Sequence, residues 1–104
     1  MAARVLALYS HPADPAAFDA YYAQTHLPIA KKLPGLRAYT TSAGQLATGD
    51  GSQAPYYLVA ELDFDSLEAI AAGLQTPEGA ATVADLANFA QAGVQIVFYE
   101  LKDV

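Results

Sequence analysis

His26 is the side chain of this sequence best suited to moving protons. An imidazole has an unperturbed pKa of about 6.5, so it can exchange a proton near neutral pH, as enolisation, cyclisation and isomerisation require. His26 follows Tyr22 by four residues, which places both side chains on one face of a helix. Pro28 has no N–H for the carbonyl of Gln24, which favours irregular backbone at this point. We therefore predict that His26 is an acid–base residue at a cavity wall; the structural alternative is that it caps freed backbone groups.

Tyrosines are the second group of residues that could act on a small molecule. The predicted substrate-binding tyrosines are Tyr22 in the first helix and one residue in each expected strand, namely Tyr9, Tyr39, Tyr57 and Tyr99. A phenol can orient or acidify a substrate oxygen, whereas in the alternative reading its ring fills the core and its hydroxyl reaches the rim. Because adjacent strand residues point to opposite faces, at most one of Tyr56 and Tyr57 can line a cavity.

Arg37 is the remaining candidate for substrate binding, because a guanidinium can hold a carboxylate or an enolate. Its alternative role is a surface or dimer contact. The carboxylates are weaker candidates. Asp19 lies about 10 Å along the helix from His26, which is too far for direct contact. We expect Asp85 to serve helix or dimer structure and Asp65 to cap a helix.

Several kinds of site lack the residues that they need. The chain has no Cys, which excludes a thiolate nucleophile, a disulfide scaffold and a Cys-ligated metal. His11 and His26 have no carboxylates at ligand spacing, so we predict no metal site. Residues 49–51 lack the lysine and the helix of a phosphate-binding loop, and no serine lies in a Gly-x-Ser-x-Gly turn. We expect no cofactor; a haem with His26 as axial ligand stays open as an alternative, although few basic residues could hold its propionates.

The composition is that of a small and unusually apolar chain. Of its 104 residues, 54% are hydrophobic and 15% are charged, and this length predicts a single domain over residues 1–104. Five basic against eleven acidic residues argue against nucleic-acid binding. No apolar run approaches the roughly 20 residues of a membrane helix, and the N-terminal apolar stretch is too short for a signal peptide. We expect a cytoplasmic protein that binds neither nucleic acid nor membrane.

The periodicity of apolar residues predicts four strands and two helical regions. The strands cover Val5–Ser10, Leu36–Ala43, Tyr56–Phe64 and Val94–Leu101, and the helical segments cover residues 15–33 with a break at Pro28, 65–75 and 76–90. The order strand, helix, strand, strand, helix, strand is that of the ferredoxin-like βαββαβ arrangement. We therefore predict an α+β fold, with a four-stranded antiparallel sheet and the helices on one of its faces.

Local signals mark the ends of these elements. Asp14 and Thr76 each precede a proline, which combines a capping side chain with a residue that loses no hydrogen bond in the first helical turn. Asp65 and Glu68, three residues apart, resemble a capping box. Residues 47–55 are typical of a loop and are a candidate for disorder at the tip of a hairpin.

The strands leave one face of this sheet without a cover. Every residue of 5–9 and 56–60 is apolar, and only Gln95 interrupts residues 94–99. An antiparallel sheet with one face in water normally alternates apolar and polar residues, and a bare apolar face is larger than soluble monomers tolerate. We predict a homodimer formed through the sheet faces. This arrangement allows some of the strand tyrosines to converge on the open face, and the facing sheets create a pocket for a small apolar ligand.

Residues 18–39, FDAYYAQTHLPIAKKLPGLRAY, resemble the signature of the EthD family, named for ethyl tert-butyl ether degradation. The segments TPEG at 76–79 and DLANF at 85–89 are similar to the family's second-helix pattern. The resemblance implies a dimeric α+β barrel, in a superfamily that includes cofactor-free monooxygenases, muconolactone isomerases, polyketide cyclases and haem-handling enzymes. For EthD-like proteins it implies a role auxiliary to ether breakdown by a cytochrome P450 system, without a settled reaction.

Together these features predict binding of a small apolar or aromatic metabolite in a pocket between sheet and helices. With His26 as acid or base, the protein would catalyse proton transfer, cyclisation or isomerisation, or cofactor-free oxygenation, in catabolism linked to ether or aromatic degradation. The alternative is a non-catalytic carrier or an accessory protein for an oxygenase system, and both readings stay open at this point. A third reading makes the cavity ordinary core.

Overall fold

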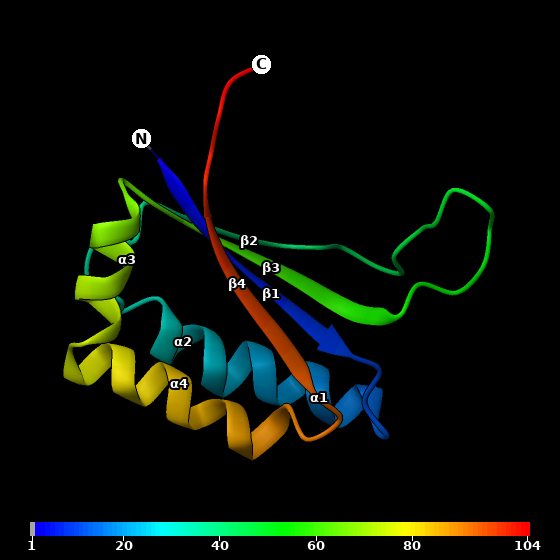
Figure 1. The fold of residues 1–104 in the computed structure, drawn as a ribbon. Coiled ribbons are helices and arrows are strands. Elements are labelled where there is room, and N and C mark those ends of the chain that lie inside the picture. Colours follow the sequence, from blue (N-terminus) through cyan, green and yellow to red (C-terminus); the bar gives the residue numbers. More distant parts are fainter. Residues whose placement is uncertain (1) are drawn as a thin grey trace.

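A computed structural model describes residues 2–104 as one antiparallel sheet of four strands, in the order β2-β3-β1-β4, with helices packed on one face (Figure 1). The strands are β1 (Ala3–Ser10), β2 (Ala38–Thr41), β3 (Tyr56–Phe64) and β4 (Val94–Glu100). The helices are α1 (Pro15–Tyr21), the π-helical turn η1 (Tyr22–His26), α2 (Leu27–Ala30), α3 (Leu67–Leu74) and α4 (Pro77–Phe89). The predicted ferredoxin-like α+β fold is confirmed.

Alternate residues of the central strand β1 point to the two faces of the sheet and differ in burial. Its residues Ala3, Val5, Ala7 and Tyr9 are buried on the helix side, and the alternate residues are only half-buried on the opposite side. The aromatic rings of Tyr9, Phe18 of α1 and Phe89 of α4 lie within 5.4–5.6 Å of one another by centroid distance. Sheet and helices are therefore joined by a cluster of rings at this end of the core.

The first helical region changes its winding instead of breaking at Pro28. Asp14 caps α1 by accepting a hydrogen bond from the backbone N–H of Ala17, as expected. In η1 the ladder widens, and the backbone N–H of Leu27 bonds to the carbonyl of Tyr22, five residues back. Pro28 then lies in the first turn of α2, where its missing N–H is tolerated. The predicted interruption is thus a π-helical turn placed just before Pro28, and the helix ends at Ala30, earlier than predicted.

The start of α3 differs from the prediction. Ser66, and not Asp65, caps this helix, because the Ser66 hydroxyl accepts a hydrogen bond from the backbone N–H of Ala69. Asp65 instead pairs with Arg37 across the surface, at 2.7 Å between Arg37 Nη2 and an Asp65 carboxylate oxygen. The cap at the start of α4 is as predicted, since Thr76 accepts from the N–H of Gly79.

The segment between β2 and β3 has a defined path. Strand β2 is shorter than predicted, although Arg37 and Ser42 on either side of it still donate backbone hydrogen bonds to β3. At the tip, Asp50 accepts hydrogen bonds from the backbone N–H and the hydroxyl of Ser52, and Thr48 donates to the Ser52 carbonyl. These contacts hold a tip for which disorder was expected.

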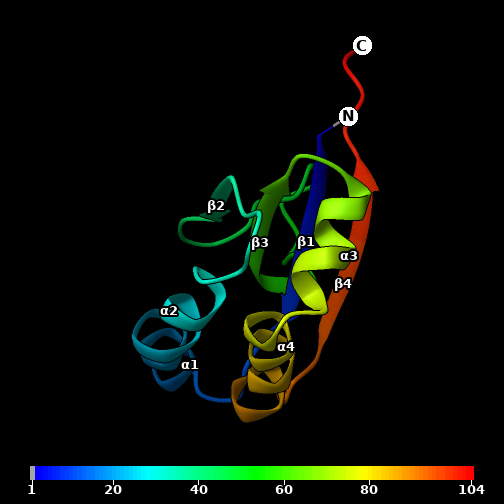
Figure 2. The same cartoon turned by 90° about the vertical axis from the view of Figure 1, so that its left-hand side faces the viewer.

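The face of the sheet opposite the helices carries no helix, as both views show (Figures 1 and 2). The register places Leu6 and Leu8 of β1 beside Val59 of β3 and Val97 of β4 on this face. Val97 is 46% exposed. The predicted open face is therefore present, and its apolar patch lies beside the charged side chains of Arg4, Glu61 and Asp63. No helix of residues 2–104 is long and apolar enough to cross a membrane.

Candidate functional site

A cavity of about 280 Å³ lies between the sheet and the helices. Its wall is mainly aliphatic and aromatic carbon from β1, β3, β4, α2 and α4. Its polar side chains are those of Tyr9, His26, Tyr39 and Thr82. An apolar pocket with a few convergent polar groups is the usual form of a small-molecule site.

The π-helical turn η1 presents His26 to this cavity. The imidazole is only 3% exposed, and its ring centroid lies 4.6 Å from that of Phe89 and 5.3 Å from that of Tyr22. Its Nδ1 atom is 2.9 Å from a carboxylate oxygen of Asp85, which lies on α4 and is also buried. The ring is therefore fixed by one hydrogen bond and by aromatic packing on two sides.

Asp85 is the centre of a buried hydrogen-bond network. Its other carboxylate oxygen accepts from the Tyr21 hydroxyl at 2.6 Å and from the Asn88 amide at 3.0 Å. Burial raises the pKa of Asp85, but the hydrogen bonds from Tyr21, Asn88 and His26 together outweigh this effect and hold the pKa below its usual range. Asp85 is therefore ionised at neutral pH.

The same surroundings determine the protonation state of His26. Burial lowers the pKa of His26, and this effect exceeds the opposing influence of the Asp85 carboxylate. At neutral pH the imidazole is therefore uncharged. Because an ionised carboxylate only accepts hydrogen bonds, Nδ1 carries the proton and Nε2 has a free lone pair. Among residues 2–104, every side-chain nitrogen or oxygen that is fully enclosed has a hydrogen-bond partner. Nε2 of His26 makes no hydrogen bond within these residues, so this atom is not fully enclosed.

Three tyrosines belong to the surroundings of His26: Tyr22 packs against its ring, and Tyr9 and Tyr39 line the same cavity. The hydroxyl oxygens of Tyr22 and Tyr39 are 2.6 Å apart, and the Tyr9 ring packs edge-on against Tyr22 with centroids 5.7 Å apart. Burial raises the pKa of each of these phenols. They are therefore protonated at neutral pH and can donate hydrogen bonds. Tyr9 and Tyr39 meet on the helix side of the sheet and not on the open face, where some of the strand tyrosines were expected to converge.

Three other residues proposed for substrate binding lie away from this cavity. The Tyr57 hydroxyl bonds to the carboxylate of Asp19 of α1 at 2.9 Å. Tyr99, paired with Arg4 in the register, lies on the open face of the sheet and is 37% exposed. Arg37 is at the surface with Asp65.

Asp85 is the residue whose role the sequence interpretation missed. It contacts His26 directly, where only a structural role was expected. One signal was available, because Asp85 falls between Thr82 and Phe89 at the three- to four-residue spacing of the inward face of α4. A carboxylate on an otherwise apolar stripe needs a buried partner.

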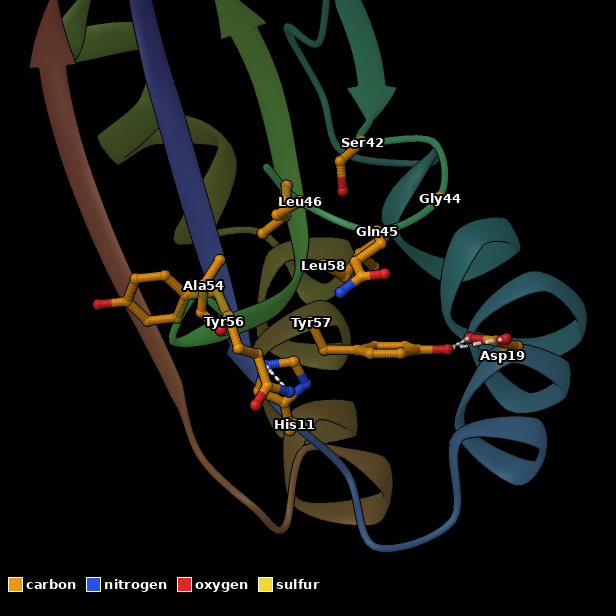
Figure 3. A pocket seen from close by; sticks show the side chains of 11 residues that line it. His11, Asp19, Ser42, Gly44, Gln45, Leu46, Ala54, Tyr56, Tyr57 and Leu58 are labelled. Atoms are coloured by element: carbon orange, nitrogen blue, oxygen red, sulfur yellow. Dashed lines mark hydrogen bonds between the residues drawn. The ribbon is translucent and has the colours of Figure 1, made fainter. Parts of the chain in front are cut away.

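A second cavity, of about 500 Å³, lies beside the loop between β2 and β3 (Figure 3). There the Tyr57 side chain extends towards Asp19, and the His11 Nε2–H donates to the Ala54 carbonyl at 2.8 Å. Both His11 and Asp19 are exposed. This cavity thus has no buried acid–base pair, which is why the His26 cavity is the candidate site. No group of three potential metal ligands occurs among residues 2–104.

Comparison with known proteins relates most of the chain to one family. The EthD domain matches residues 10–93. An uncharacterised 11.0 kDa protein from the thcB–thcC intergenic region of Rhodococcus erythropolis is 38% identical over 101 residues, which are 97% of this chain and 96% of that protein. The crystal structure of an ethyl tert-butyl ether degradation family protein from Bacillus halodurans is 30% identical, covers 98% of this chain and 100% of its own, and superposes with a TM-score of 0.88.

More distant solved structures share the fold alone. A dimeric ferredoxin-like protein of unknown function from Thermobifida fusca is 20% identical, with a TM-score of 0.69 over 97% of this chain and 92% of its own. SnoaB, a cofactor-independent oxygenase from Streptomyces nogalater, is 17% identical, with a TM-score of 0.63 over 99% of this chain and 94% of its own. The ferredoxin-like architecture is therefore shared by a protein of unknown function and by an oxygenase.

Proposed function

The chain belongs to the EthD domain family, as the motif at residues 18–39 predicted, and on that premise we propose that it binds a small apolar molecule and transfers a proton on it. The observation that carries this proposal is the buried His26–Asp85 pair beside an apolar cavity. An uncharged imidazole with Nε2 free is a general base, and Asp85 holds it in the tautomer that this role needs. The sequence alone suggested the histidine but not its partner.

The proposed step begins when Nε2 of His26 takes a proton from the bound molecule. The imidazolium that forms is stabilised by the Asp85 carboxylate, in the manner of the histidine–aspartate pairs of hydrolases. Burial alone would disfavour this cation, and the Asp85 carboxylate offsets part of the cost of forming it in an apolar site. Proton abstraction is a first step common to isomerisation, cyclisation and cofactor-free oxygenation, the reactions expected from the sequence.

The size and lining of the cavity support a compact ligand. A cavity of about 280 Å³ is close to the lower end of small-molecule pockets, roughly 300 Å³, and exceeds the ~150 Å³ void that can hold benzene. Ile96 and Phe98 of β4 and Val83 of α4 line it and are 40–52% exposed, so its mouth is apolar as well. We propose an aromatic or alicyclic metabolite. A place in ether or aromatic catabolism and a cytoplasmic location remain parts of this proposal.

The test combines ligand binding with hydrogen exchange. Small apolar ketones and phenols are screened by thermal shift, because a ligand that binds the native state raises its stability. Ketones that bind are then incubated with the protein in D₂O, and exchange of the C–H protons next to their carbonyl is followed by NMR; phenols report binding only, because their O–H exchanges with water unaided. We expect His26→Ala to retain binding and lose exchange, and His11→Ala, at the other histidine, to retain both.

Each other outcome supports a rival reading. Binding without exchange in the wild-type protein supports a carrier or an accessory protein. No thermal shift with any ligand of the panel supports the reading of the cavity as core and contradicts the proposed function.

We further propose that two copies of the chain pair through the open face of the sheet. The apolar side chains of Leu8 and Val97 on this face support it, as does the description of a fold neighbour as dimeric. We expect a dimer mass by light scattering at micromolar concentration and a monomer mass for Val97→Asp. Leu67→Asp, at an exposed leucine of α3, is the matched control and should stay dimeric. A monomeric wild-type protein would contradict the proposal.

A further inference from the structure

We infer that the molecule bound beside His26 is neutral and carries a carbonyl or phenolic oxygen, which the Tyr39 hydroxyl holds while His26 takes the proton. The inference rests on the proposed function and names its substrate class. It is carried by the pairing of the Tyr22 and Tyr39 hydroxyls at 2.6 Å, at the wall of the cavity that His26 also lines.

The hydroxyl pair leaves one proton available for a ligand. Each phenol has one O–H, and in a hydrogen-bonded pair one hydroxyl donates to the other. Tyr22 is 5% exposed and lies behind the wall, whereas Tyr39 lines the cavity. When Tyr22 donates to Tyr39, the Tyr39 proton is free to point into the cavity. A donor that is itself a hydrogen-bond acceptor is strengthened by that bond, which suits it to a developing oxyanion.

The donor and the base line one cavity and are linked through Tyr22. The Tyr22 ring lies 5.3 Å from the His26 ring by centroid distance, and Tyr22 holds Tyr39 directly. Both Tyr39 and His26 line the same cavity of about 280 Å³. One compact ligand can therefore contact both groups.

The charges of the site favour a neutral substrate. No lysine or arginine is among the described residues that line the cavity, and Arg37 is at the surface. A carboxylate ligand would thus enter an apolar cavity without a counter-ion, next to the ionised Asp85. A neutral ligand avoids this cost, because its oxyanion forms only as His26 becomes a cation.

The proposed proton transfer is balanced without a further reactant. The bond between hydrogen and the carbon next to a carbonyl breaks, its electron pair moves to the carbonyl oxygen to give an enolate, and the proton bonds to Nε2. Return of the proton to the same carbon gives exchange, and return to another carbon gives an isomer. A phenol undergoes the equivalent step at its O–H. No electron enters or leaves.

Three probes of similar shape test the inference: 4-chlorophenol, 4-chlorotoluene and 4-chlorobenzoate. Their affinities are measured by ligand-observed NMR at pH 7.5. We expect the phenol to bind about ten-fold or more tightly than the toluene, since one hydrogen bond in a buried site contributes on that order. The benzoate should bind at least ten-fold more weakly than the phenol. Equal affinity for phenol and benzoate would overturn the argument from charge.

Tyr39→Phe is the decisive variant, and Tyr57→Phe at the other cavity is its matched control. Tyr39→Phe should reduce the preference for phenol over toluene, because the Tyr39 donor is lost while Nε2 of His26 still accepts from the phenol O–H; toluene affinity should be unchanged, and Tyr57→Phe should retain the full preference. If the preference is undiminished in Tyr39→Phe, or falls as much in Tyr57→Phe, the inference is wrong even where hydrogen exchange supports the proposed function. If no probe binds the wild-type protein, the proposed function fails with it.

Thermal melting checks that both variants are folded. Should Tyr39→Phe fail to fold, Tyr22→Phe replaces it, with a smaller loss of the phenol preference expected because only the support of the donor is removed. An unchanged preference in Tyr22→Phe then counts against the inference.

Discussion

Replacing Asp85 by alanine should destabilise the fold far more than loss of an ordinary surface carboxylate. The substitution leaves the Nδ1–H of His26 buried without an acceptor, while the exposed Asn88 can turn to water. A buried donor that loses its partner costs about 1–3 kcal/mol, and breaking a buried charged pair costs about 3–5 kcal/mol. Because the imidazole is uncharged, we expect the lower part of this combined range, about 1–3 kcal/mol. That is a large fraction of the roughly 5–15 kcal/mol by which a small domain is stable.

Urea unfolding at pH 7.5 and a single protein concentration measures this change. The chain has no Trp, so circular dichroism or tyrosine fluorescence serves as the probe. Asp65→Ala is the control, because Asp65 also binds two side-chain N–H groups, those of Arg37, but in water. We expect its midpoint to stay within error of the wild-type value. Equal midpoints for Asp85→Ala and Asp65→Ala would refute the assignment of a buried network to Asp85.

Four further outcomes are expected. Burial lowers the pKa of His26 below its usual 6.5, so between the two pKa values the unfolded chain binds a proton that the folded chain does not. The stability of the fold should therefore fall as the pH drops below 6.5. Urea midpoints should show this decline in the wild-type protein and not in His26→Gln. Asp85, whose folded pKa is also lowered, adds a second loss of stability below pH 3.8, which Asp85→Asn should lack in the same series. Gly79→Ala should destabilise by about 1–3 kcal/mol in urea, because a Cβ there meets the Gly73 carbonyl and the Leu74 backbone, whereas Gly49→Ala, with open space, should not. Tyr21→Phe should raise the pKa of His26, read from imidazole chemical shifts, because Asp85 then loses a competing donor.

The order of the elements was predictable because its signals are local. The side chains of Asp14 and Thr76 accept hydrogen bonds from backbone N–H groups three residues later in the chain. Both partners of each cap therefore lie within one short stretch of the sequence. The error at Asp65 has the same local origin. Two capping residues stand side by side there: Ser66 caps the helix, whereas the Asp65 carboxylate pairs with Arg37, 28 residues away in the sequence.

The candidate site was only half predictable, because its second half is assembled by tertiary contact. His26 is marked by its residue type and by the neighbouring Pro28. Its partner Asp85 is 59 residues away, and only the packing of α4 against η1 brings the two together. The position of Tyr9 likewise depends on the register of β1 with β3, which shifts between Tyr9 and Ser10. Such a shift leaves no sign in the apolar pattern of either strand.

The two apolar faces of β1 have a consequence for folding specificity. The register of a strand is normally specified by the contrast between an apolar face and a solvent-exposed polar face, since a slip by one residue would exchange the two faces. In β1 that contrast is weak, because Leu6 and Leu8 are apolar and could be buried in the core as readily as Val5 and Ala7. What distinguishes the correct register is charge: Arg4 stands opposite Asp63, with Nε and a carboxylate oxygen 2.6 Å apart. A slipped sheet would carry Arg4 into the core, so this one guanidinium specifies the alignment that hydrophobicity leaves open.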